Sequence, residues 1–486
     1  MDLRSLETQS LIEVARALRA GEVSAEGLAH AHLQRIESLD GDYNAVLVRN
    51  PDGLAIARAL DAEFAAGRCV GPMHGVPILV KDNLDSADRM PTTAGSLALA
   101  DTYASKDSSV LHRLRQAGAV LLGKTNLSEW ANFRSSRSSS GWSSVGGQTR
   151  NAHDPLRTPG GSSSGSGVAV ALGYVPAAIG TETDGSIVGP ASMNGVVGFK
   201  PSVGLVSRAG IVPISASQDT AGPMARSVRD CAFMLNVIVG TDDRDLSVAQ
   251  ADTYQVDYVA ALDGIDPSTL RIGIARECSG FHDRVDTLFD QAVAELRAAG
   301  VTVVDAVTIG DPAAVRVPER IVMEYEFKAG LNAYLDTREA GTVPADLDAL
   351  IAFNAAHADE VMPYFGQEIQ LRAQNRGRLD DEQYHQARAL SVALAANEGI
   401  DAALREHQLD ALIAPTMTPA WLIDWIGGDN RRGGAACAPA VAGYPHITVP
   451  MGLVEHLPVG LSVFSGAFED LKVLQIANLF EQLKQA

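Results

Sequence analysis

The chain has 486 residues, of which 46% are hydrophobic and 20% charged. This composition allows a large buried core and excludes wholesale disorder. The formal net charge is -20, which argues against nucleic-acid or anionic-membrane binding, because both require a basic surface.

The N-terminus lacks the basic stretch followed by an apolar stretch that marks a secretory leader. No apolar run reaches the ~20 residues that span a bilayer. We therefore expect a cytoplasmic protein, although a chain trimmed of a secretory leader would look the same. The four cysteines are far apart and form no Cys-x-x-Cys pair, which predicts buried free thiols rather than a disulfide framework or a zinc site.

In chain order, apolar spacing first predicts helices at 11–18 and 25–36, the second capped by Ser24. Next come a buried strand at 75–82, a helix at 110–117 and a strand at 119–124. The apolar run 168–179 is helix-like and continues this alternation. Such alternation indicates an α/β core with crossover connections.

The second half of the chain continues the same pattern. The loop 133–148 is rich in serine, glycine and arginine, and it is long enough to suggest that it lines a site. The stretch 345–406 is nearly free of proline and dense in helix formers, which is typical of a helical layer or lid. The remaining predicted elements are strands at 271–275, 411–416 and 446–450 and a helix at 285–299. No repeat or long linker divides the chain, so we expect a single domain.

Two clusters of glycines and hydroxyl residues, 160–167 and 180–186, flank the apolar run. Glycine lets the backbone approach a ligand closely, and a hydroxyl beside converging N–H groups is the minimum for acyl transfer. A Gly/Ser run is more often a flexible linker. Because this one leads into an apolar helix-like segment, we favour a site.

The sequence offers few bases for such a nucleophile. His74 and His153 are the nearest histidines, and neither has a carboxylate partner in sequence, although a Ser-His-Asp triad could assemble from distant residues. Gly118 to Thr125 formally matches a phosphate loop, but the apolar residues 119–122 make the match coincidental. Lys81 follows the apolar run 76–80, and burial could bring its pKa from about 10.4 to about 7 at roughly 4–5 kcal/mol. Judged from its place in the sequence alone, Lys81 is more simply interpreted as a surface lysine at the end of a strand than as a base. The same interpretation applies to Lys124.

Several segments together resemble the amidase signature family: 75–83, 123–129, 160–167, 180–186, 442–445 and 457–461. The resemblance spans most of the chain. It implies an α/β fold with a large single-domain mixed β-sheet core, covered by helices on both sides, over residues 1–486. Within that domain we expect a signature core at 60–235, which carries the catalytic residues, and a helical layer at 340–406 near the substrate entrance.

The resemblance also implies a Ser–cis-Ser–Lys triad. It makes Ser186 the nucleophile, Ser162 the bridging serine with a cis peptide, and Lys81 the base. The backbone amides of the oxyanion hole map to Thr183, Asp184, Gly185 and Ser186, and Ser163 supports the site by hydrogen bonding. No metal and no cofactor is implied.

At the expected nucleophile the sequence differs from the pattern of many family members, and this difference indicates which branch of the family it resembles. Many family members have Gly-Gly-Ser-Ile-Arg at the nucleophile, whereas residues 184–188 here read Asp-Gly-Ser-Ile-Val. This difference weakens the interpretation as a glutamine-amidotransferase-type subunit. The segments 138–142, 146–151, 325–331 and 350–354 are similar to the peptide amidases, which convert C-terminal peptide carboxamides into free acid and ammonia.

The leading hypothesis is thus an amide hydrolase that forms an acyl-enzyme with C-terminal peptide amides. The alternatives are an amidase for small aryl or aliphatic amides and, further off, an amidotransferase-type subunit or a non-catalytic binding member. The expected partner is a small-molecule or peptide amide substrate, with no nucleic acid and no membrane. We expect a monomer or homodimer.

Overall fold

The computed structural model describes residues 8–339 and 341–485. Its main sheet consists of β1 (Val46–Arg49), β2 (Pro77–Lys81), β3 (Val120–Thr125), β6 (Ala177–Glu182), β7 (Val197–Lys200), β8 (Thr220–Ala225), β9 (Arg271–Ala275), β10 (Thr302–Val307), β11 (Ala411–Pro415), β12 (His446–Val454) and β13 (Leu457–Phe464). These 11 strands follow the order β1-β3-β2-β6-β8-β7-β12-β13-β11-β9-β10. A separate short hairpin pairs β4 (Trp142–Ser143) with β5 (Gly147–Gln148).

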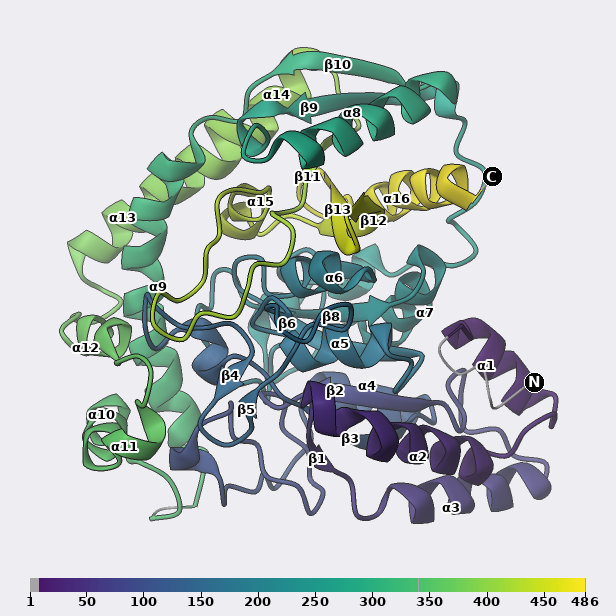
Figure 1. Cartoon of the computed structure of the whole chain (residues 1–486), viewed down its shortest axis with the longest axis vertical. Helices are drawn as coiled ribbons and strands as arrows, with labels where there is room; N and C mark the ends of the chain where they lie inside the picture. Colours follow the sequence, from purple (N-terminus) through teal and green to yellow (C-terminus); the bar gives the residue numbers. More distant parts are fainter. Residues whose placement is uncertain (1–7, 340, 486) are drawn as a thin grey trace.

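Helices flank the sheet, as Figure 1 shows. They are α1 (Leu11–Arg19), α2 (Ala25–Tyr43), α3 (Gly53–Ala65), α4 (Ser109–Gln116), α5 (Ser164–Ala171), α6 (Val188–Asn194), α7 (Val228–Ile238), α8 (Asp283–Ala298), α9 (Pro312–Leu335), α10 (Leu347–Ala356), α11 (Ala358–Val361), α12 (Glu368–Gln374), α13 (Glu382–Val392), α14 (Asp401–His407), α15 (Cys437–Ala442) and α16 (Asp470–Gln485). A π-helical stretch, Ala393–Ile400, joins α13 to α14. The predicted α/β fold with one large mixed sheet is confirmed.

The direction of the strands brings distant residues together. β2 lies between β3 and β6 and is parallel to both, with Val80 paired to Ile179. Parallel strands end at the same edge of a sheet, so the end of β2 at Lys81 lies beside the end of β6. Helix α5 begins inside the first glycine and hydroxyl cluster and α6 follows the second, and the two helices pack against each other at this place.

The composition of the apolar run 168–179 indicates one helix-like segment. The structure instead divides the run between a helix and a strand. α5 ends at Ala171, and β6 begins at Ala177. Gly173 adopts a positive φ of 67°, its N–H donates to the Val170 carbonyl, and the Tyr174 N–H donates to the Ala169 carbonyl. This pair of hydrogen bonds is a Schellman cap, which a glycine just beyond the helix makes favourable.

Most other predicted elements are present with small shifts of their ends. The predicted helices at 11–18, 25–36, 110–117 and 285–299 correspond to α1, α2, α4 and α8, and Ser24 caps α2 by accepting the Gly27 N–H. The predicted strands at 75–82, 119–124, 271–275, 411–416 and 446–450 correspond to β2, β3, β9, β11 and β12. The residues 345–406 are helical for most of their length.

The four cysteines are all free, as predicted. Cys231, Cys278 and Cys437 are buried, but Cys69 is exposed, because it lies in the turn after α3 rather than in the core. Among the described residues, no helix is long and apolar enough to cross a membrane.

Candidate active site

Lys81 stands at the end of β2 with no exposed surface. Its Nζ donates hydrogen bonds to Ser162 Oγ at 2.7 Å and to Thr181 Oγ1 at 2.8 Å. Asn83 Nδ2 donates to the same Thr181 hydroxyl at 3.0 Å. Lys81 is therefore not the surface lysine that its place in the sequence suggests when taken alone, since it lies against the hydroxyls of Thr181, within β6, and of Ser162, just before α5.

Burial lowers the pKa of Lys81 from its ordinary value to about 7, against the opposing effect of the carboxylates of Asp219 and Glu182. None of the ion pairs between described residues involves Lys81, so no carboxylate touches its ammonium group. A lysine with such a pKa is substantially neutral near pH 7. It can then accept a proton from a neighbouring hydroxyl.

The Gly161–Ser162 peptide bond is cis. Two glycines in this region are required by close packing: a Cβ at Gly161 would lie 2.4 Å from Ser128 Oγ, and one at Gly180 would lie 2.8 Å from Ser163 Oγ. Ser163 Oγ donates to the Thr181 carbonyl at 3.0 Å and accepts the Thr181 N–H at 3.1 Å. Ser163 thereby joins the start of α5 to the end of β6.

Ser186 lies in the turn between β6 and α6. Gly185, just before it, has a φ of 80°, in the left-handed region that favours glycine. The Ser163 N–H donates to the Ser186 carbonyl at 3.1 Å, which ties the two serine-bearing segments together. Glu182 Oε2 accepts the N–H groups of Ile187 and Val188 at 2.7 and 3.0 Å and so fixes the far side of the turn.

A cavity of about 200 Å³ opens at this turn, and Thr183, Asp184, Gly185 and Ser186 all line it. Among the hydrogen bonds found between described residues, none uses the backbone N–H of Asp184, Gly185 or Ser186. These N–H groups are thus available to an oxygen atom bound beside Ser186. The other walls of this cavity include Met323 of α9 and, from the loop between β11 and α15, Trp421 and Arg431.

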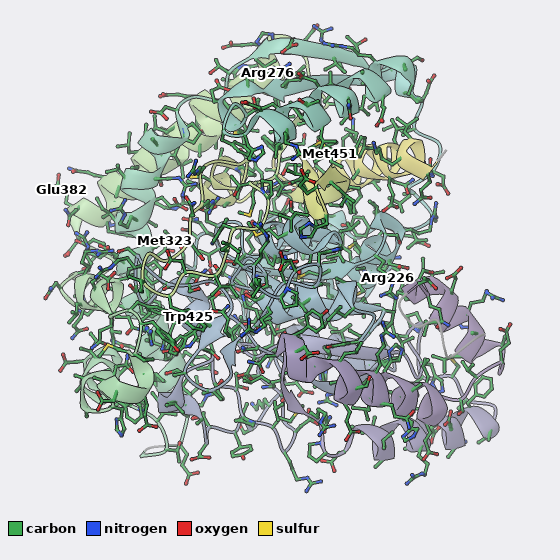
Figure 2. The ribbon with its side chains drawn as sticks, in the orientation of Figure 1. Arg226, Arg276, Met323, Glu382, Trp425 and Met451 are labelled. Carbon is green, nitrogen blue, oxygen red and sulfur yellow. The ribbon has the colours of Figure 1, made fainter. Side chains whose placement is uncertain are left out.

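Figure 2 labels Met323 and, on the same loop as Trp421, Trp425; both lie on the side of the molecule where that loop passes in front of α9. Trp425 Nε1 donates to Gln148 Oε1 at 3.0 Å, so the loop is attached to the β4–β5 hairpin.

A second cavity of about 400 Å³ is lined by Ser162, Thr181 and Asn83. It shares Ala131, Thr183 and Ile214 with the smaller cavity, so the two adjoin. We call them the relay cavity (beside Ser162) and the nucleophile cavity (beside Ser186), after the roles that the family resemblance implies for these two serines.

Asp184 is the centre of a charged cluster at the nucleophile cavity. Arg316 Nη1 lies 3.6 Å and Arg431 Nη2 lies 3.9 Å from its carboxylate oxygens. Oxygen atoms of Asp184 and Glu319 and the sulfur of Cys437 lie within 4.8 Å of one another. Burial, together with the charge of Asp184, raises the pKa of Glu319 to about 8. A cation in this cluster would meet two guanidinium groups, so we assign no metal to it.

The structure brings Lys81, Ser162 and Ser163 into one hydrogen-bonded group, and the backbone bond to Ser163 places Ser186 next to it. Sequence reasoning gave no role to Thr181, although it lies inside the cluster 180–186. It also gave none to Asp219, which accepts the Thr183 hydroxyl at 2.5 Å, or to Arg431. Asp219 and Arg431 stand in no recognisable motif, and only the fold places them here.

Other candidate residues lie elsewhere. His74 accepts the Val70 N–H, His153 contacts the Asn194 carbonyl, and neither lines the two cavities. Of the loop 133–148, Phe133 and Ser140 line the nucleophile cavity. Arg134 and Trp142 of this loop are buried. Arg134 pairs with Glu129 at 2.7 Å.

The comparisons with known proteins agree with one another. The family model described as Amidase matches residues 28–474. The crystal structure of the peptide amidase PAM with the competitive inhibitor chymostatin is 48% identical, with a TM-score of 0.95 over 99% of this chain and 98% of that one. Native peptide amidase from Stenotrophomonas maltophilia is 47% identical, with a TM-score of 0.93 over 99% and 97%. A glutamyl-tRNA(Gln) amidotransferase subunit of Chloroflexus aurantiacus is 36% identical over 96% of this chain and 95% of its own length.

Proposed function

Because the chain belongs to the amidase family and is an amidase, a hydrolase of carbon–nitrogen bonds other than peptide bonds, we propose that it converts C-terminal peptide amides into free acid and ammonia. Ser186 is the nucleophile, Ser162 the relay and Lys81 the base. The observation that carries the chemistry is the hydrogen bond from the fully buried Lys81, whose pKa is near 7, to Ser162.

In the first half of the reaction Ser186 Oγ attacks the amide carbon. Its proton passes through Ser162 to neutral Lys81, and the same path then returns a proton to the leaving nitrogen. That second transfer is essential, because an unprotonated amide anion is a very poor leaving group. The free N–H groups of residues 184–186 donate hydrogen bonds to the carbonyl oxygen and so stabilise the negative charge that develops on it. Water then attacks the acyl-enzyme and gives a proton to Lys81 through Ser162; the ester bond to Ser186 breaks, the proton returns to Ser186 Oγ, and the free acid leaves.

The choice of peptide amides rests on the relatives, since a peptide amidase matches this chain over nearly its whole length at 48% identity. The nucleophile cavity fits this choice. Arg431 lines it with its Nη2 3.9 Å from a carboxylate oxygen of Asp184, so the wall of the cavity carries polar groups suited to the carbonyl and N–H groups of a peptide chain.

The direct test is Ser186→Ala, which we expect to abolish the covalent acyl-enzyme seen by mass spectrometry after rapid acid quenching. Ser192→Ala is the matched control: Ser192 lies on α6, is also buried, and its hydroxyl makes no hydrogen bond with the described residues. If Ser186→Ala keeps near-parental hydrolysis of a peptide amide, the assignment of the nucleophile is wrong.

The substrate class is tested by ammonia release from N-acetylated dipeptide amides, benzamide and hexanamide. We expect the dipeptide amides to have the highest kcat/KM. Release from benzamide or hexanamide alone would contradict the peptide-amide assignment and leave the triad intact.

A further inference from the structure

Gln218 contacts the turn that carries Ser186, although it lines neither cavity. It stands two residues before β8, where the antiparallel pairing of Thr220 with Glu182 brings it beside Thr183. Its side chain is buried, and its Nε2 donates a hydrogen bond to the Thr183 carbonyl at 3.2 Å. Gln218 therefore reaches the backbone of the turn from outside the space that the substrate occupies.

This hydrogen bond acts on one of the N–H groups to which we assign the carbonyl oxygen of the substrate. The Thr183 carbonyl and the Asp184 N–H belong to one trans peptide unit, so they point in opposite directions. Because Gln218 holds the carbonyl, the Asp184 N–H is directed away from Gln218, and Asp184 lines the nucleophile cavity. A hydrogen bond to the carbonyl also polarises the peptide unit and strengthens its N–H as a donor.

Glu319 of α9 sets the orientation of the Gln218 side chain. Gln218 Nε2 also donates to Glu319 Oε1 at 3.1 Å, so both N–H bonds of the amide have an acceptor. Glu319 is itself buried, and its Oε2 lies 3.6 Å from Cys437 Sγ. Rotation of the amide would leave a buried donor without a partner, which is unfavourable. The two acceptors therefore hold Gln218 in one orientation.

The charge state of Glu319 suits this arrangement. Arg316 and Arg431 face the Asp184 carboxylate, whereas Glu319 forms no ion pair within the described part of the chain. Burial, followed by the charge of Asp184, raises the pKa of Glu319 to about 8, so this acid is mostly neutral at pH 7. A neutral acid accepts from Gln218 without repelling the negative charge that develops on the substrate oxygen.

We propose that Gln218, held by Glu319, is a positioning residue of the reaction: it fixes the peptide unit between Thr183 and Asp184 so that the Asp184 N–H meets the oxygen of the tetrahedral intermediate. This inference rests on the proposed function, because it uses the same nucleophile. No bond is made or broken at either side chain. The segment before β8 and helix α9, which supply no residue to the proposed triad, thereby contribute to the rate.

The direct test is Gln218→Met, which keeps the length of the side chain and removes its N–H groups. For an N-acetylated dipeptide amide we expect kcat to fall by about 10-fold or more, while KM stays within about twofold. The reason is that the Asp184 N–H is required most when the oxygen carries negative charge. The corresponding dipeptide aldehyde forms a hemiacetal with Ser186 Oγ and presents an oxygen at the same place, so its Ki should rise by the factor by which kcat/KM falls.

Gln367→Met is the matched control. Gln367 is a buried glutamine whose Nε2 donates to the Ile351 carbonyl at 3.1 Å, and it lines neither cavity. This variant also loses a hydrogen bond from a buried glutamine to the backbone, so urea denaturation should show a loss of stability similar to that of Gln218→Met. Its kcat, KM and aldehyde Ki should stay at the parental values.

A second pair of variants tests the contribution of Glu319. Glu319→Gln keeps an uncharged oxygen that accepts from Gln218, and its kcat should stay within about threefold of the parental value. Glu319→Leu removes this acceptor and should lower kcat by about fivefold or more at an unchanged KM.

An unchanged kcat in Gln218→Met, or a loss confined to KM, overturns the inference and leaves the proposed function standing. A reduced kcat with an unchanged aldehyde Ki also overturns it. If Gln218→Met does not fold, the Glu319 variants decide, and equal kcat values in Glu319→Gln and Glu319→Leu overturn the inference. Failure of the unmodified enzyme to release ammonia from the dipeptide amide refutes the proposed function itself.

Discussion

Two lysines on neighbouring parallel strands, Lys81 on β2 and Lys124 on β3, have the same burial and opposite surroundings. Neither has any exposed surface. Within the described part of the chain, Lys81 Nζ donates hydrogen bonds only to hydroxyl and carbonyl oxygens, those of Ser162 and Thr181. Lys124 Nζ lies 3.5 Å from a carboxylate oxygen of Asp82 and donates to the Thr92 hydroxyl and the Pro91 carbonyl.

Burial lowers the pKa of both lysines, but the Asp82 carboxylate opposes this effect directly at Lys124. A buried ammonium with a counter-ion keeps its charge and fixes the strands. A buried amine among hydroxyls gives up its proton near neutral pH and can act as a base. The partner, rather than the degree of burial, separates the structural lysine from the one that we propose as the base.

The largest effect is expected from Lys81→Ala. Without the base, Ser186 is not deprotonated, and kcat/KM for a peptide amide should fall by about 1,000-fold or more. Steady-state ammonia release measures this loss, with circular dichroism to show that the fold persists. Retention of more than a tenth of the parental rate would remove Lys81 from the mechanism.

Lys124→Met should act on stability. It leaves the Asp82 carboxylate buried without its cation, and we expect the free energy of unfolding to fall by about 3–5 kcal/mol. Urea denaturation measures the change. The double variant Lys124→Met/Asp82→Asn removes both charges and should recover most of the loss; an equally unstable double variant would show that packing, not charge, is responsible.

The pH dependence of activity should report Lys81. Only the neutral amine accepts a proton, and its pKa of about 7 is lower than the ordinary 10.5. The neutral fraction therefore grows as pH rises, so kcat/KM should increase about tenfold per pH unit below pH 7 and level off above about pH 8. If kcat/KM instead rises only near pH 10, burial does not lower the pKa of Lys81 as described.

The smallest effect is expected from Thr181→Val. The Thr181 hydroxyl accepts from Lys81, a contact that favours the ammonium form, so its loss should move the activity limb to lower pH by less than about one unit. Thr92→Val makes the same change at Lys124 and should leave the limb in place. A shift to higher pH in Thr181→Val would contradict the role given to this hydroxyl.

Much of the site could be predicted from the sequence, because its parts are contiguous segments. The turn 183–186 and the serines 162 and 163 lie in glycine-rich clusters whose small residues the packing requires, as the clash at Gly161 shows. The strand that ends at Lys81 follows from a short apolar run. The cap at Gly173 was missed, because the residues on both sides of it are equally apolar.

The charged residues around Asp184 could not be predicted in this way. Arg316 and Glu319 come from α9, whereas Arg431 and Cys437 come from the last fifth of the chain. No spacing in the sequence relates these residues to Ser186. The expectation that 340–406 lies near the substrate entrance stays a prediction; the helical wall of both cavities comes from α9.

The sequence by itself determined the local chemistry: which serines stand in turns built by glycine, and which lysine ends an apolar strand. Beyond what the family resemblance implies, only the tertiary structure decided which lysine meets a carboxylate and which meets hydroxyl groups. Lys81 and Lys124 end similar apolar strands, and their pKa values depend on groups brought beside them from elsewhere in the chain. The two cavities are likewise a product of packing, because their walls join β6, α9 and the loop after β11. Electrostatic and steric surroundings of this kind depend on distances in space, which a sequence pattern does not contain.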